Sequence, residues 1–508
     1  MKQIYKKLLA AALGVSMLLS MVGCGQNDTS GQTQTGGENE AKVLTIVTAK
    51  ELDNLTTLTM NKENNIACGL VYETLVAYED GEIVPELAEE WGWDETNTVL
   101  TFKLRQDVAF TDGAAFNAES VKEILDFDRS NPNFSGIKGI YNIESVEVVD
   151  EYTVAVHYAA PCFSYINDFC FQNVAGMMSP NVFEAKNFQT FTDVVGTGPY
   201  IREEMISGDC TRFVRNENYW GEAPYYDEVV IKYIPEASSR LQALQTGEVD
   251  LIYGADLLSY DDYNQALSLD GIEGAINDGN TLTRNLVLNA SSEILSDLKV
   301  RQAIAYAVNK EEITKGLTYG YETPATSLFA PGAPYTDITY NSTWSYDLDK
   351  ANALLDEAGW VMNESTGIRE KDGQQLSLNY TYWTDLSLAQ DMALAIKTQL
   401  AEVGIDVTTT GQDQMTWWTE GVAGNYDITT WNTEGSYTEP HKFLQESLGA
   451  DPHAISLQAL EDFQSYSDAV NAFSTSADPE VVQSAIATAL NVSNDNVIDL
   501  PISYSKDL

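Results

Sequence analysis

The stretch PEASSRLQALQTGEVDLIYG, residues 235–254, indicates which kind of fold this chain adopts. Its first half predicts a helix from Pro235 through Leu244 that stops at Gly247, because glycine readily takes the left-handed conformation that ends helices. The apolar run VDLIY, residues 249–253, follows at once and predicts a strand. A helix that leads directly into an apolar strand is typical of an α/β protein.

Towards the N-terminus the same alternation continues. Residues 99–104 (VLTFKL) alternate with a period of two and predict a strand. Asn117 is a good N-cap for the helix AESVKEIL that follows it. Residues 146–157 (VEVVDEYTVAVH) predict a β-hairpin that turns around Asp150.

Towards the C-terminus the pattern is equally regular. Residues 298–314 place apolar side chains on one face of a predicted helix, and Asp347 caps another helix that ends at residues 358–360 (AGW). A predicted strand at 376–382, an amphipathic helix at 387–403 and a strand at 405–409 follow. These segments predict a second α/β lobe.

The length and charge of the chain exclude several classes of function. Its 508 residues are enough for two or three packed units. With 76 acidic and 28 basic residues the net charge is -48, which repels the phosphates of nucleic acids. We therefore expect a multi-lobed protein that does not bind nucleic acid.

The first 41 residues resemble an export signal and a tether. Three lysines within the first seven residues precede an apolar run that ends just before Cys24. This pattern predicts a lipoprotein signal peptide over 1–23, cleavage before Cys24, and diacylation of that cysteine. Residues 24–41, rich in Gly, Gln, Asn, Thr and Ser, predict a disordered tether. We expect an extracytoplasmic protein that is held to the cell membrane only by its lipid.

Recognisable catalytic and metal signatures are missing from the sequence. It contains no GxSxG, HExxH, Walker-type GxxxxGK or EF-hand loop, and no cysteine and histidine cluster at zinc spacing. Its histidines are His157, His441 and His453, and the first lies in a predicted strand. We expect neither an enzyme nor a resident cofactor.

Several long segments carry a resemblance to a known family. They are residues 212–254 (RFVRNENYWGEAPYYDEVVIKYIPEASSRLQALQTGEVDLIYG), 300–313 (VRQAIAYAVNKEEI), 195–200 (VGTGPY), 328–335 (LFAPGAPY), 346–360 (YDLDKANALLDEAGW) and 500–504 (LPISY). Together they resemble the extracellular solute-binding proteins of family 5, which feed dipeptides, oligopeptides and nickel chelates to ABC importers. The resemblance is nearly colinear from about Val43 to the end.

The resemblance implies a two-lobed α/β fold like that of type II periplasmic binding proteins, with mixed sheets and a central ligand cleft. Lobe I would take residues 42–283, with an inserted subdomain at about 76–190, and lobe II residues 284–476. The segment 477–508 would return to lobe I. Ligand capture would then act by closure of the lobes about a hinge.

The implied function is that of the substrate-binding lipoprotein of an ABC importer, a monomer that hands a peptide or a metal chelate to permease and ATPase subunits. A peptide-sensing receptor partner in signalling would share this architecture. A secreted hydrolase is the third hypothesis, and it would convert its ligand.

Within the family, the chain most resembles the nickel-binding branch. There a histidine ligates nickel that arrives in an organic chelate, and aromatic residues stack on the chelate. His441 and His453 lie near the matching loop and are the candidate metal ligands, with His453 the better positional match, since imidazole suits nickel. The candidate ligand-binding residues from this match are Trp418, Trp431, Tyr437, Asn65, Asn173 and Arg284. The two asparagines stand where nickel-binding proteins carry a methionine and an arginine, so Arg284 or Arg129 is expected as the substitute partner for a carboxylate.

Peptide binding is the competing hypothesis. In peptide-binding relatives an acidic residue pairs with the amino group of the peptide, and Glu434 stands three residues after Trp431. Tyr382, Trp383, Trp417 and Trp418 would supply apolar pocket walls. The sequence leaves the peptide and nickel-chelate hypotheses open.

Overall fold

The computed structural model describes residues 41–52, 55, 65–79, 82–131, 134, 137–161, 163–182, 193–254, 257–276, 282–433 and 440–508. These residues form two compact units. The first unit takes the described residues up to Gly92, then Leu100–His157 and Asp168–Ile252. The second takes Trp93–Val99, Tyr158–Asn167 and Tyr253–Leu508.

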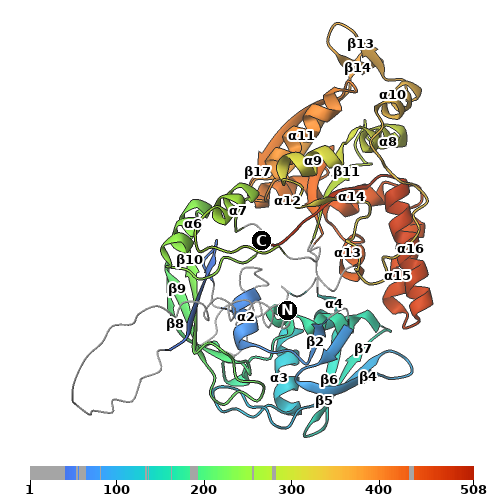
Figure 1. Cartoon of the computed structure of the whole chain (residues 1–508). Coiled ribbons are helices and arrows are strands. Elements are labelled where there is room, and N and C mark those ends of the chain that lie inside the picture. Colours follow the sequence, from blue (N-terminus) through green and yellow to red (C-terminus); the bar gives the residue numbers. More distant parts are fainter. Residues whose placement is uncertain are drawn as a thin grey trace, which may run out of the picture. The chain divides into compact units, whose positions relative to one another are not determined.

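The first unit contains a four-stranded sheet in the order β1-β10-β9-β8 (Figure 1). The strands are β1 (Val43–Thr48), β10 (Glu228–Tyr233), β9 (Cys210–Arg215) and β8 (Tyr200–Ile206). Only the β1 and β10 pair is parallel. Apolar side chains from these strands, including Ile46, Phe213 and Ile231, pack against helix α2 (Asn65–Val71) in one core. Helix α6 (Ala237–Thr246) follows β10.

A second four-stranded sheet has the order β4-β5-β7-β6. Its strands are β4 (Ala88–Trp93), β5 (Val99–Leu104), β7 (Thr153–Tyr158) and β6 (Ile143–Asp150), and helix α3 (Ala118–Asp128) contacts β6. The hairpin of β2 (Val76–Glu79) and β3 (Glu82–Pro85) precedes this sheet. The short helices are α4 (Lys138–Tyr141), α5 (Gln172–Ala175) and the 3-10 segments η3 (Phe163–Cys170) and η4 (Pro180–Val182).

Buried Glu73 connects the VGTGPY and NYWG segments of the first unit through hydrogen bonds. Its carboxylate accepts hydrogen bonds from Tyr219 Oη at 2.7 Å, Trp220 Nε1 at 2.7 Å and Thr197 Oγ1 at 3.0 Å. A side chain on Gly196 would place its Cβ 2.2 Å from the carbonyl oxygen of Val71. The VGTGPY and NYWG segments therefore hold the backbone of this unit together.

The second unit is built around a six-stranded sheet in the order β12-β19-β11-β18-β16-β17. Its strands are β12 (Thr323–Pro324), β19 (Asp499–Tyr504), β11 (Thr283–Leu288), β18 (Ile428–Asn432), β16 (Ser377–Trp383) and β17 (Asp406–Gln412). β16 runs parallel to both β17 and β18, whereas β11 is antiparallel to its two neighbours. Every residue of β11 and β19 is buried, as expected for strands covered on both faces.

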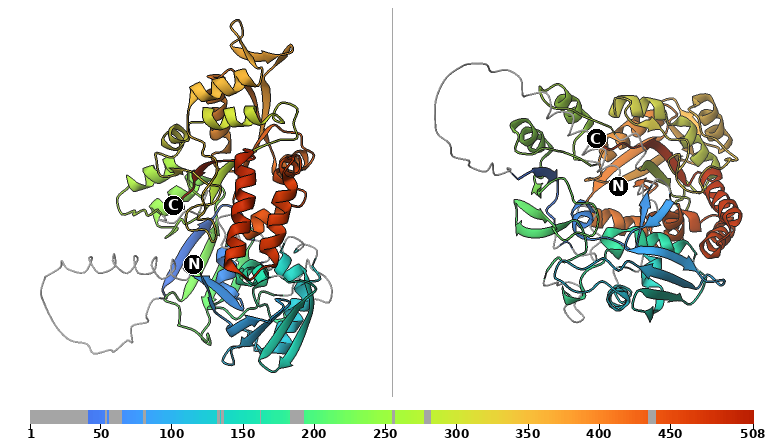
Figure 2. Two further views of the ribbon diagram at one scale, coloured as in Figure 1. Left: turned by 90° about the vertical axis from the view of Figure 1, so that its right-hand side faces the viewer. Right: turned by 60° about the horizontal axis from the view of Figure 1, so that its bottom comes forward.

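Helices cover both faces of this sheet. One core joins the sheet to α8 (Leu298–Ala307), α9 (Lys310–Leu317), α10 (Leu348–Glu357) and α11 (Ala389–Ala401). The other joins it to α13 (His441–Glu446), α14 (Pro452–Gln458), α15 (Phe463–Thr475) and α16 (Pro479–Asp495). Figure 2 shows α15 and α16 side by side. The remaining elements are α7 (Tyr260–Leu267), α12 (Gln414–Val422), β13 (Val361–Asn363), β14 (Ile368–Lys371) and β15 (Gln374–Gln375).

Most predicted elements form where the sequence places them. Strand β5, helix α3 with its Asn117 cap and the hairpin of β6 and β7 match their predictions, as do α10, β16, α11 and β17 within a few residues. Gly247 ends α6 with φ 71°, in the left-handed region. In these segments local pattern and tertiary packing agree.

Two predicted elements differ in the structure. The helix predicted over 298–314 is two helices, because Val308 is extended and the Asn309 side chain accepts from the backbone N–H of Glu312, starting α9. The predicted strand 249–253 makes only an isolated bridge between Leu251 and Ile46. There the Asp250 carboxylate accepts the Thr45 N–H at 2.8 Å and replaces a backbone partner.

The C-terminal segment also lies elsewhere than predicted. We expected residues 477–508 to return to lobe I, but α16 packs on α15 and β19 pairs with β11 and β12 in the second unit. The first unit ends at Ile252 rather than at residue 283. Helix α7 is tied to the second unit, because Tyr260 donates to Glu322 and Tyr321 donates to Asn264.

Candidate functional site

Three parallel strands of the second unit end along one edge of its sheet. β16 ends at Trp383, β17 at Gln412 and β18 at Asn432, and Trp383 and Gln412 are direct register partners. The antiparallel strand β11 begins beside them with Thr283 and Arg284, which is paired with Asn432. We call Thr283, Trp383, Gln412 and Asn432 the strand-end edge. In α/β sheets, ligands commonly bind beyond the carboxyl ends of parallel strands.

Four tryptophans cluster at this edge. The ring centroids of Trp417 and Trp431 are 5.4 Å apart, those of Trp418 and Trp431 6.3 Å, and those of Trp383 and Trp417 6.4 Å. The three pairs have interplanar angles of 27–32°. Such near-parallel indoles offer flat apolar surfaces to a ligand. Trp383, Trp418 and Trp431 are among the predicted ligand-binding residues, and Trp417 is a predicted wall of the peptide pocket.

Helix α12 carries two of the four rings, Trp417 and Trp418. The Asp413 carboxylate caps this helix by accepting from the backbone N–H groups of Met415 and Thr416. Trp417 is buried, and its Nε1 donates to Thr429 Oγ1 at 2.9 Å. Trp418 is 42% exposed. One ring is therefore fixed within the protein while its neighbour is presented to solvent.

Four polar atoms of the strand-end edge have no hydrogen-bond partner. They are Trp383 Nε1, Gln412 Oε1, Asn432 Oδ1 and Thr283 Oγ1, and each is buried within the part of the chain that the structure describes. Buried polar atoms are usually paired, so a group of unpaired ones needs an explanation. Sequence reasoning missed Thr283, Gln412 and Asn432. Only Gln412 stands near a predicted strand, at 405–409, whereas no predicted strand pointed to Thr283 or Asn432.

Arg284 lies at the same edge, but its guanidinium is engaged in a buried ion pair. Its Nε lies 2.9 and 3.2 Å from the two carboxylate oxygens of Glu322, and its Nη1 donates to the Ser387 carbonyl at 3.0 Å. Tyr260 and Ser503 donate to the same carboxylate. The predicted role of Arg284 as a partner for a ligand carboxylate stays a prediction.

The two candidate metal-ligating histidines lie in the second unit. His453 Nε2 is 2.7 Å from Asp499 Oδ2, and although burial opposes a charge on the ring, the Asp499 carboxylate raises the pKa of His453. His441 is buried between Tyr335 and Phe473, and burial lowers its pKa to about 4. Among the described residues no group of three or more His, Cys, Asp or Glu could hold a metal ion. The metal role of both histidines remains a prediction.

The other predicted residues fall into three groups. Tyr382 is buried in the apolar core of the second unit. Asn65 is the exposed first residue of α2 in the first unit, and Asn173 lies in α5. Cys24, Glu434 and Tyr437 lie outside the described residues.

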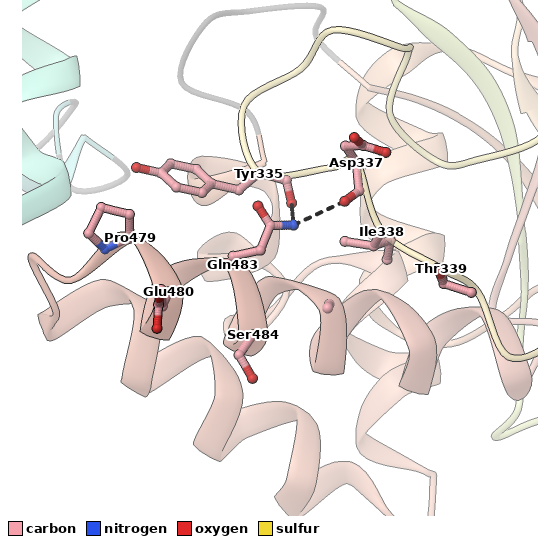
Figure 3. Close-up of a pocket in the computed structure, with 9 residues that line it drawn as sticks. Tyr335, Asp337, Ile338, Thr339, Pro479, Glu480, Gln483 and Ser484 are labelled. Atoms are coloured by element: carbon pink, nitrogen blue, oxygen red, sulfur yellow. Dashed lines mark hydrogen bonds between the residues drawn. The ribbon is translucent and has the colours of Figure 1, made fainter.

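A separate surface groove lies on the second unit between α16 and the preceding loop around Tyr335 (Figure 3). Its volume is about 480 Å³. Gln483 on α16 fastens the loop by donating to the carbonyl oxygens of Tyr335 and Asp337 at 3.1 and 3.3 Å. The lining residues are Tyr335, Asp337, Ile338, Thr339, Pro479, Glu480, Gln483, Ser484 and Ala487. None of them belongs to the strand-end edge.

The architecture and the strand-end edge are those expected of a ligand-binding protein, and comparison with known proteins identifies the class. The profile of the bacterial extracellular solute-binding proteins, family 5, matches residues 82–453, and the chain belongs to this family. The predicted fold class, mixed α/β with two lobes as in periplasmic binding proteins, is thereby confirmed. No helix in the described parts of the chain is long and apolar enough to cross a membrane.

The relatives include nickel-binding proteins, in agreement with the predicted resemblance, and also a glutathione-binding protein. The nickel-binding periplasmic protein of Escherichia coli (strain K12) is 30% identical over 449 residues, which cover 86% of this chain and 84% of that protein. The glutathione-binding protein GsiB of Salmonella typhi is 30% identical over 340 residues, covering 66% and 62%. The crystal structure of NikA from Brucella suis in complex with Fe(III)-EDTA superposes with a TM-score of 0.87 at 29% identity, covering 92% of this chain and 94% of NikA.

Proposed function

We propose that this protein captures a small organic solute, either a peptide or a metal chelate, at the strand-end edge of its second unit and delivers it to an ABC permease. The tryptophan cluster at the ends of β16, β17 and β18 carries this proposal. Planar aromatic surfaces suit both an amide-rich peptide and the organic part of a chelate. Family membership supports a role in transport.

Both ligand classes have support in named relatives. The Escherichia coli relative is a nickel-binding protein, and the Brucella suis NikA structure holds Fe(III)-EDTA. The Salmonella typhi relative binds glutathione, a peptide. A metal that arrives inside a chelator brings its own ligands, so it requires only one or no protein ligand. The nickel or other metal would be cargo rather than a cofactor.

Delivery without chemical change is part of the same proposal. Binding a solute more tightly in one conformation shifts the population of that conformation, and no bond need be broken. Permease and ATPase subunits of an ABC importer would be the partners. The alternative, a receptor partner in signalling, would use the same ligand site. Such a protein would co-purify with a sensor protein instead of with permease and ATPase subunits.

Anchoring at the membrane surface is proposed from the sequence alone. Cleavage before Cys24 and diacylation of its thiol would attach the folded units through residues 24–41. In a Cys24→Ser variant the protein should move from the membrane fraction to the medium or periplasm. Retention of that variant in the membrane fraction would contradict the anchor.

Native mass spectrometry of the protein purified from its host tests solute capture directly. We expect an additional mass that corresponds to a peptide or a metal chelate and that disappears in a Trp418→Ala variant. Tyr346→Ala is the matched control, because Tyr346 is also an exposed aromatic residue of the second unit, 45% exposed, but lies outside the tryptophan cluster. Conversion of added peptides into fragments would favour a hydrolase instead.

A further inference from the structure

The tryptophan cluster offers aromatic surface that no described lysine or arginine covers. Four cation–π contacts occur in the described parts of the chain, and they involve the rings of Trp220, Tyr225, Tyr306 and Trp360. None of these rings belongs to the cluster. Among aromatic side chains, the indole face attracts cations most strongly. Trp418, which is 42% exposed, therefore presents such a surface to a solute.

The segments that leave the strand ends beside the cluster carry no positive charge. Residues 383–396, after the end of β16, and residues 411–440, which include α12 and β18, contain no lysine, arginine or histidine. Arg284 at the start of β11 is the nearest cation along the sheet register, and its charge is compensated by Glu322 at 2.9 Å. An anionic solute would thus find no unpaired cation on these segments.

Two exposed carboxylates lie at the same edge. The Thr384 N–H donates to the Gln412 carbonyl oxygen at 2.9 Å, so the residues that follow them, Asp385 and Asp413, occupy neighbouring positions. Both side chains are exposed. The edge is therefore negative on the side where the loops leave β16 and β17.

Asp413 is held close to the cluster and keeps its charge. It stands one helical turn before Trp417, whose backbone N–H donates to the Asp413 carbonyl oxygen at 2.8 Å. The Thr416 hydroxyl donates to the Asp413 carboxylate at 2.6 Å and holds the pKa of Asp413 below its usual range. This carboxylate is consequently ionised at neutral pH.

We propose that the tryptophan cluster recognises a positively charged organic group of the captured solute. An alkylammonium or guanidinium group would lie against the indole rings, and the Asp385 and Asp413 carboxylates would attract it. The net charge of -48 acts in the same direction over longer distances, because it raises the local concentration of cations. This inference rests on the proposed capture of a solute at this edge and adds the charge of that solute.

Calorimetric titration with a matched pair of dipeptides tests the preference for a cation. Glycyl-L-arginine and glycyl-L-citrulline have nearly the same shape, but the guanidinium of the first is replaced by an uncharged urea group in the second. We expect the natural protein to bind glycyl-L-arginine about tenfold more tightly. Equal affinities, tighter binding of glycyl-L-citrulline, or no binding of glycyl-L-arginine would overturn the inference.

Two substitutions separate the contribution of the ring from that of the carboxylate. Trp418→Leu keeps an apolar side chain but removes the indole face, and it should reduce the preference to about twofold or less. Asp413→Asn keeps the helix cap, because asparagine caps as well as aspartate, and should weaken glycyl-L-arginine about two- to fivefold without affecting glycyl-L-citrulline. If Trp418→Leu weakens both dipeptides equally, the ring is merely an apolar contact and the inference fails.

Tyr346→Leu is the matched control for the ring. Tyr346 is an exposed aromatic residue of the second unit outside the cluster, 45% exposed, and its substitution should leave both affinities unchanged. A change in the preference as large as that of Trp418→Leu would contradict a specific role of the cluster.

A charged chelate separates this inference from the proposed function. If Ni(II)-EDTA, an anion, binds with an affinity that Trp418→Ala weakens while glycyl-L-arginine does not bind, solute capture stands and the preference for cations fails. If none of these probes binds and the native mass spectrum of the host protein shows no added mass, solute capture itself is contradicted.

Discussion

Buried polar groups are treated in opposite ways in two regions of this protein. In the first unit the Glu73 carboxylate is surrounded by three donors, from Thr197, Tyr219 and Trp220. At the strand-end edge of the second unit four polar atoms have no partner among the described residues. A satisfied network fixes a fold, whereas unsatisfied groups beside an exposed aromatic ring, here Trp418, are available to a ligand. The difference separates a structural motif from a candidate site.

The largest effect on stability is expected for the buried ion pair of Arg284 and Glu322, which lies at the strand-end edge. Arg284→Met should destabilise the second unit by about 3–5 kcal/mol, because it leaves the fully buried Glu322 carboxylate without its cation. Urea unfolding followed by tryptophan fluorescence measures this loss. The double variant Arg284→Met/Glu322→Leu should recover most of the stability. A single variant as stable as the natural protein would show that the pair contributes nothing.

A pH titration probes a second cation, the half-buried Lys310. Lys310 Nζ donates to the Ala325 carbonyl at 3.1 Å, and burial lowers the pKa of Lys310 to about 8. Since the unfolded chain holds this proton up to about pH 10.4, stability should rise as pH increases from 8, by up to about 3 kcal/mol in total. Unfolding at pH 7.5 and 9.5 should show part of this rise in the natural protein and none in Lys310→Met. Parallel pH profiles would contradict the prediction.

Removing the Glu73 carboxylate tests directly whether the two regions respond differently to the loss of a buried polar group. Glu73→Leu strands the donors of Tyr219 and Trp220 in a buried place, and we expect a loss of about 2–4 kcal/mol in the free energy of unfolding. Gln412→Leu at the strand-end edge removes an acceptor of similar shape and should not destabilise. If both substitutions destabilise equally, the distinction between the two regions disappears.

The smallest effect on stability is expected at the exposed ring of the tryptophan cluster. Trp418→Ala should change the free energy of unfolding by about 1 kcal/mol or less, because Trp418 is 42% exposed, while weakening solute binding about tenfold. Titration of the co-purified solute and urea unfolding of the same sample measure both quantities. Loss of stability in proportion to loss of binding would assign Trp418 to the core instead.

Much of the fold follows from local sequence, and the failures have local causes. Asn117 and Asp347 cap their helices as predicted, since the side chain and the backbone it caps are neighbours in sequence. The break at Val308 and Asn309 was missed because the apolar periodicity continues across it. The failure of residues 249–253 to form a strand depends on Asp250 reaching Thr45, a contact across 205 positions.

The candidate site was only half predictable. Trp383, Trp418 and Trp431 were found from residue type, because tryptophan is conspicuous wherever it occurs. Gln412 and Thr283 were missed, because a glutamine or threonine in a sequence gives no sign of being unpaired. That property appears only when strands distant in the chain are placed side by side.

The tight packing of the VGTGPY segment has a consequence for how such proteins diversify. Gly196 touches the main chain at Val71, so selection on this position acts through the scaffold and not through the cargo. Related proteins could change the solute that they bind by substituting the residues at the ends of β16, β17 and β18 while keeping the glycines. Sequence searches based on the glycines would then find binding proteins for many different solutes. Only the residues at the strand ends would distinguish these proteins by solute.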